Sequence, residues 1–162
     1  MRIDGHGLRD HLRLLSPLFG LIAGVWALRL IMNLAGTPAM LVRMVSVGVA
    51  GAVSVLVAVF LIHFKRFGSY ASVVVASFVL IAWEQILIVL AISVTLLSGK
   101  LNVYTEPAYT FGESHAQHIA AHLTYGLGVE SIFGAAMGCL VLWMLRRLVP
   151  SKEASPSGKP VL

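Results

Sequence analysis

The 162-residue chain is 58% hydrophobic and only 12% charged, and its mean hydropathy is +0.88. A soluble domain usually carries about 25% charged residues, so this composition excludes a water-soluble globule. The net charge of +5 comes from basic residues that flank apolar segments. Such flanking charge is a signal of membrane topology, and we expect no nucleic-acid partner.

Four apolar segments follow one another, each close to the roughly 20 residues that cross a membrane core of about 30 Å. We expect spans at residues 17–34, 39–64, 70–97 and 118–145. Their continuous apolar runs favour helices, because in lipid only helices and closed barrels satisfy every backbone hydrogen bond. The sequence therefore predicts an all-α integral membrane protein. A four-helix bundle occupies residues 1–149, and a polar, disordered cytoplasmic tail follows at 150–162.

The ends of the spans differ in charge. His6, Asp10 and His11 precede the first span, and we expect them on a short approach helix with solvated side chains. Most basic residues lie on one side of the predicted topology: Arg2, Arg9, Arg13, Lys65, Arg66, Arg146, Arg147, Lys152 and Lys159. By the positive-inside rule, both termini face the cytoplasm, and we expect the chain in the cell (inner) membrane with the lipid bilayer as a partner.

Polar side chains recur inside the spans at one depth. At about 1.5 Å per residue, Arg29, Asn33, Glu84 and Glu130 fall about 18–24 Å from the cytoplasmic boundary. Charged groups facing lipid are costly, so these should face inward, with Arg29 pairing with Glu130 or Glu84. Asn33 and Gln85 can supply further hydrogen bonds. The layer is either a salt bridge that fixes helix register or a polar cavity open to the noncytoplasmic side.

Three histidines gather at the outer end of the last span. His115, His118 and His122 are spaced by three and four residues, which places them on one helical face. His118 and His122 can converge on a divalent transition metal such as Zn(II), Cu(II) or Fe(II), with His115 or Glu113 completing the coordination. Haem is less expected, because the histidine inside another span, His63, lies at the cytoplasmic end.

The same stretch also has an ordinary explanation. Histidines suit a helix end in water, and TFGE and SHAQ each fit a capping box with Thr110 or Ser114 as the N-cap. On this interpretation the histidines hold no metal.

Three classes of function follow from these patterns. The leading one is binding of a transition metal or small ligand in an outer-side polar cavity. The second is a noncatalytic structural or accessory subunit, because pairs of small residues such as Gly20/Gly24 and Gly134/Gly138 let helices pack closely in a homo-oligomer or larger membrane complex. The third is proton handling or pH sensing through the histidines and the intramembrane carboxyls. The sequence carries no established catalytic signature, and if the protein is an enzyme we expect its reaction to use the bound metal.

Overall fold

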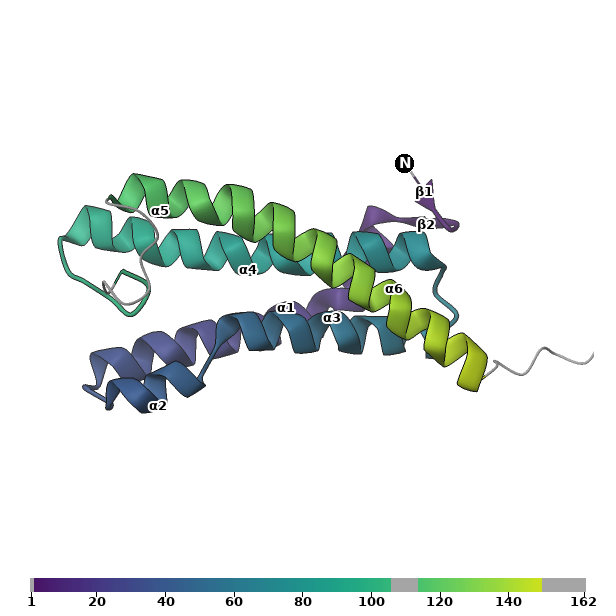
Figure 1. Ribbon diagram of the computed structural model, residues 1–162, viewed down its shortest axis with the longest axis horizontal. Helices are drawn as coiled ribbons and strands as arrows, with labels where there is room; N and C mark the ends of the chain where they lie inside the picture. The colour runs from purple at the N-terminus through teal and green to yellow at the C-terminus, as the bar shows by residue number, and fades with distance from the viewer. Residues whose placement is uncertain (1, 106–113, 150–162) are drawn as a thin grey trace, which may run out of the picture.

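The computed structural model describes residues 2–105 and 114–149, which form a bundle of long helices (Figure 1). Within these residues four helical segments are long and apolar enough to cross a membrane: Leu8–Leu34, Ala39–Phe64, Tyr70–Ser98 and His115–Leu148. The predicted helical fold with four candidate spans is therefore confirmed. The predicted tail at 150–162 lies outside the described residues.

The N-terminus is a small hairpin, so the expected approach helix is wrong for His6, whereas Asp10 and His11 lie in the first turns of a helix as expected. Strands β1 (Arg2–Ile3) and β2 (His6–Gly7) pair antiparallel, and α1 (Leu8–Leu34) begins directly after them. The connecting residues Asp4 and Gly5 have φ angles of 53° and 82°. An Asp-Gly pair with positive φ at both positions is a frequent signal for a tight two-residue hairpin turn.

Asp4 ties this hairpin to the start of another helix. Its Oδ2 atom accepts hydrogen bonds from the Ser69 amide at 2.7 Å, the Ser69 hydroxyl at 2.7 Å and the Ser72 hydroxyl at 2.8 Å. These bonds, that of the Ser69 hydroxyl first, lower the pKa of Asp4 to about 2. Because Ser69 is the N-cap of α4 (Tyr70–Ser98), the carboxylate lies at the positive end of that helix.

The histidines near the N-terminus are packed against Phe67. The His6 ring stacks on Phe67 with centroids 4.0 Å apart, and the His11 ring meets Phe67 edge-on at 4.9 Å. His11 is 1% exposed. The prediction that these histidines are solvated is therefore wrong for His11, since the hairpin and the 65–69 loop cover it.

The helices differ in detail from the predicted spans. Helix α1 begins at Leu8 and carries Pro17 in its interior. The second span is broken into α2 (Ala39–Met44) and α3 (Val47–Phe64), because Ser46 caps α3 by accepting a hydrogen bond from the Val49 amide at 3.3 Å. The fourth span is continuous but consists of three parts: α5 (His115–Ala121), the π-helix η2 (His122–Glu130) and α6 (Ser131–Leu148).

Helices α3 and α4 form the centre of the bundle. Helices α1 and α6 each pack against both of them, and η2 packs against α4. The largest fully buried side chains include Leu15, Ile22, Ile62, Leu80, Ile92 and Leu142. Figure 1 places α2 and α5 at one end of the bundle and the N-terminal hairpin at the other. The predicted site residues belong to the half of the bundle that ends with α2 and α5.

Candidate functional site

A chain of hydrogen bonds connects four polar side chains from α4, α5 and η2. The Nε2 atoms of His118 and His122 are 3.1 Å apart, and Nδ1 of His122 is 2.7 Å from Oε1 of Gln85. The Gln85 Nε2 atom donates to Oε2 of Glu130 at 2.7 Å. Because the Gln85 amide oxygen only accepts, His122 carries its proton on Nδ1 when neutral, and its Nε2 accepts from His118. The chain thus has one consistent direction, from His118 to Glu130.

Gly126 allows this chain to form. It lies in η2 directly against Gln85, and a Cβ added there would be 2.5 Å from Oε1 and 2.8 Å from Cδ of Gln85. Any side chain at this position would push the amide out of place. Sequence reasoning missed Gly126, because no local pattern marks which side chain of another helix a glycine will meet.

The π-helix also changes which side chains share a face. The predicted geometry assumed about 100° of rotation per residue throughout the fourth span. In η2 the i→i+5 bonding widens the turn, so the rotation per residue is smaller. As a result His122 and Glu130, the first and last residues of η2, both reach Gln85. Segments of this kind are frequent at functional sites.

A small cavity of about 140 Å³ lies at the histidine end of the chain. His118 and His122 line it together with Arg29 and Tyr104, and the Arg29 guanidinium lies 4.9 Å from the Tyr104 ring centroid. Tyr104 is there because the loop after α4 folds back, with Asn102 Nδ2 donating to the Ala91 carbonyl at 2.7 Å. Burial raises the pKa of Tyr104 to about 12, against the opposing charge of Arg29, so its phenol stays protonated.

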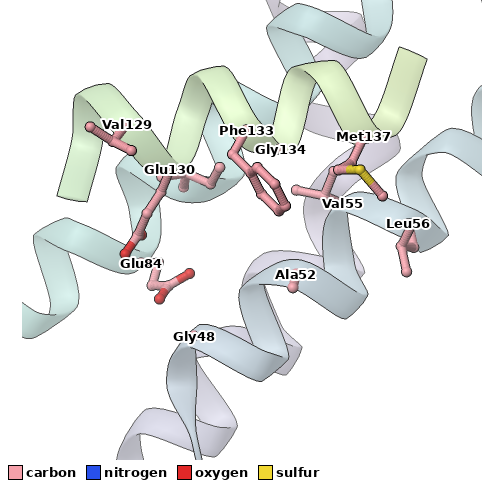
Figure 2. Close-up of a pocket in the computed structure, with 11 residues that line it drawn as sticks. Gly48, Ala52, Val55, Leu56, Glu84, Val129, Glu130, Phe133, Gly134 and Met137 are labelled. Atoms are coloured by element: carbon pink, nitrogen blue, oxygen red, sulfur yellow. The ribbon is translucent and has the colours of Figure 1, made fainter. Parts of the chain in front are cut away.

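A larger cavity of about 600 Å³ lies at the Glu130 end of the hydrogen-bond chain, between α3, α4 and the η2–α6 segment (Figure 2). Its lining is mostly apolar, with two carboxyl groups: Gly48, Ala52, Val55, Leu56, Ile81, Glu84, Val129, Glu130, Phe133, Gly134 and Met137. Glu84 is 3% exposed, whereas Glu130 is an exposed residue. Glu84 lies against Gly51 of α3, where an added Cβ would overlap its carboxyl group.

The structure brings most of the predicted site residues together, in two cavities joined by one residue. Arg29 lies at the histidine cavity, Glu84 and Glu130 lie at the larger one, and Gln85 connects the two. The expected pairing of Arg29 with a glutamate stays a prediction. The contacts seen are Arg29 over Tyr104 and Gln85 donating to Glu130.

Other predicted residues lie apart from these cavities. Asn33, near the end of α1, and His115, at the start of α5, line neither of them. Glu113 and Thr110 lie outside the described residues. The predicted Ser114 capping box is confirmed, since Ser114 Oγ accepts from the Gln117 amide and Gln117 Oε1 accepts from the Ser114 amide.

Among the described residues, no group of three or more His, Cys, Asp or Glu side chains is arranged to hold a metal ion. Within these residues, the imidazoles of His118 and His122 form a pair of candidate metal ligands. Comparison of the chain with models of protein families, with curated proteins and with solved structures found no match. The functional argument therefore rests on the geometry of the site.

Two glycines of η2 provide a matched test of the hydrogen-bond chain. Gly126→Ala places its methyl group against Gln85, and we expect it to lower stability by about 1–3 kcal/mol through broken buried hydrogen bonds. Gly128→Ala has nothing within 4 Å of its added Cβ, and we expect it to be neutral or to stabilise by about 0.5–1 kcal/mol. Thermal unfolding in detergent measures both. Equal stability of the two variants would contradict the role assigned to Gly126.

Proposed function

We propose that the protein is a multi-pass protein of the cell membrane with both termini in the cytoplasm. The four long apolar helices support insertion. The charge distribution supports the orientation, because most basic residues of the described chain lie at the end that carries the N-terminal hairpin: Arg2, Arg9, Arg13, Lys65, Arg66, Arg146 and Arg147.

Single cysteines at two exposed lysines test this orientation. In a Cys139→Ser background, we expect Lys100→Cys to react with a membrane-impermeant maleimide in intact cells, because it lies on the noncytoplasmic side. Lys65→Cys should react only after permeabilisation. Labelling is read by gel shift, and the reversed pattern would overturn the orientation.

We further propose that the protein binds a small molecule with an apolar body in the cavity of about 600 Å³. This volume falls within the range of about 300–1,000 Å³ that is typical of small-molecule sites. The observation that carries the proposal is the space itself. Its lining is apolar except for two carboxyl groups, which is the composition expected of a site for a small molecule.

The cavity opens on the side of the bundle. Leu56, Val129 and Phe133 line it and are 39%, 59% and 68% exposed. In a membrane this opening faces the acyl chains, so an apolar ligand reaches the site from the bilayer. The carboxyl groups of Glu84 and Glu130, at one end of the cavity, then fix the ligand's orientation. Most apolar pockets orient their ligands in this way, through a small number of polar groups.

A filling substitution tests ligand binding. Ala52 lines the cavity, so Ala52→Trp places an indole in it. The neighbouring Val53 does not line the cavity, so Val53→Trp is the control. Two probes of nearly equal shape, triphenylphosphine oxide and methyltriphenylphosphonium, are added to purified protein in detergent. We expect at least one to raise the unfolding temperature of the wild type and of Val53→Trp, and neither to raise that of Ala52→Trp. Indistinguishable shifts in all three proteins would overturn the proposal.

A second candidate, divalent transition-metal binding, is favoured by the histidine geometry. Two nitrogens that bind one tetrahedral Zn(II) at about 2.0–2.1 Å lie about 3.3 Å apart, close to the observed 3.1 Å between the Nε2 atoms of His118 and His122. The Gln85 amide holds the other nitrogen of His122, as outer partners of metal ligands do. The remaining positions would be taken by water or by a ligand from outside the described residues.

Metal titration tests the imidazole pair. If it binds metal, Zn(II) or Cu(II) should bind near one equivalent in detergent. His118→Gln or His122→Gln should then weaken binding about 10-fold or more, because one imidazole remains. His115→Gln, which lies outside the cavity lining, serves as the control. An empty wild type under metal-replete conditions, or full occupancy in the double variant, would exclude this candidate.

The remaining alternatives make different predictions. A structural or accessory subunit should bind neither probe nor metal, and the hydrogen-bond chain would then serve only to fix the helices. Proton handling is less favoured, because the chain passes through the Gln85 amide, which does not take up and release protons near neutral pH.

A further inference from the structure

Glu84 has an unusual environment for a carboxyl group. It lies on α4, is 3% exposed and lines the cavity of about 600 Å³. Within residues 2–105 and 114–149, no hydrogen bond or ion pair to its carboxyl oxygens is present. A buried carboxylate without a partner costs several kcal/mol, roughly, whereas a paired one is tolerated. The group is therefore either neutral or balanced by a cation, and a bound cation would favour its ionised form.

The backbone of α3 makes room for this carboxyl group. Gly51 lies directly beneath it, and Gly48 would place a Cβ 3.6 Å from Oε1. These glycines provide no donor side chain and no cation. The carboxyl group is accommodated by shape and is left to face the cavity, where Figure 2 shows it.

Glu130 supplies a second acidic group to the same cavity. Its Oε2 atom accepts one hydrogen bond from Gln85, which fixes the side chain without neutralising it. Figure 2 shows Glu84 and Glu130 at the same end of the cavity, with Phe133 and Met137 further along it. The site therefore combines an acidic end with an apolar body.

Three kinds of occupant fit this combination poorly. A metal ion requires several oxygen or nitrogen ligands, and beyond the two carboxyls the cavity wall is apolar. A neutral lipid chain would fill the apolar body but leave Glu84 without a partner. A second copy in a symmetric dimer would present the same surface, including its own exposed Glu130, and so would add like charge.

We propose that the cavity binds an organic cation with an apolar body, held at its charged end by Glu84 and Glu130. This inference rests on the ligand-binding function proposed above and names the class of ligand. The cation balances both carboxyls, and the exposed Phe133 ring can contact it through its π face. The apolar body lies along Val55, Leu56 and Met137 and leaves towards the side of the bundle.

Comparing the two triphenyl probes tests the charge preference at matched shape. Their dissociation constants are measured on the purified full chain in a neutral detergent. We expect methyltriphenylphosphonium to bind about 10-fold or more tightly than triphenylphosphine oxide, because only the cation is attracted by the carboxyls. Glu84→Gln should remove most of this preference, and the double variant Glu84→Gln/Glu130→Gln should remove all of it. Affinity for the neutral oxide should stay within about twofold in both, which also shows that the cavity is intact.

Two further variants separate the role of Glu84 from a general effect on folding. Gly51→Ala keeps both carboxyls but displaces that of Glu84, so it should lower the preference for the cation. Ser93→Ala is the control on the same helix, since its hydroxyl donates to the Val89 carbonyl and does not line the cavity. It should leave both affinities unchanged.

The outcomes distinguish the two proposals. If both probes bind equally to the wild type, or if the preference survives the double variant, the cation class is wrong while ligand binding stands. If neither probe binds, the ligand-binding function fails as well. If neither probe binds and Phe133→Ala converts a dimer into a monomer, the cavity is an interface between copies of the chain.

Discussion

The arrangement of the polar site depends on the side-chain amide of Gln85. An amide presents one face that donates and one that accepts, so it can join two groups only in a fixed sense. Here the acceptor holds His122 and the donor holds Glu130. Because Gln85 is 2% exposed, water does not replace either partner easily. Two regions of the site, one basic and aromatic and one acidic and apolar, are thereby held in a constant relation.

This arrangement is possible because the backbones of η2 and α3 come close to polar side chains of α4. At Gly126 the chain of η2 passes directly over the Gln85 amide, and at Gly51 the chain of α3 passes directly under the Glu84 carboxyl. Each glycine leaves room for one polar group on α4. In the proposed membrane setting, such groups would otherwise meet lipid or the packed side chains of a neighbour. Glycine here therefore serves the placement of polar groups as much as helix packing.

The two ends of the bundle are built differently. At the hairpin end, Asp4 closes the structure with three hydrogen bonds to the start of α4, and the rings of His6 and His11 pack on Phe67. At the opposite end, the polar residues surround two cavities. The hairpin end has a cavity of its own, of about 370 Å³, but the predicted site residues line the cavities of the opposite half.

The sequence by itself determined the helices, because the hydrophobic pattern that marks a candidate membrane span is local. The four candidate spans, the Ser114 capping box and the position of Glu84 and Glu130 at one level of the bundle could all be deduced from short stretches. The Asp4-Gly5 turn carried an equally local signal, which the expectation of an approach helix overrode.

Only the tertiary structure decided which polar groups meet. Gln85 and His122 are 37 residues apart, and their contact depends on the π-helical turns of η2 and on Gly126. Neither the π-helical turns nor the role of Gly126 can be recognised from the sequence of one helix. The same holds for Tyr104, which a folded-back loop places beside Arg29. Hydropathy is a property of each residue separately, whereas hydrogen bonds and cavities arise between helices. The level of the site along the bundle could therefore be predicted from the sequence, but the contacts within the site could not.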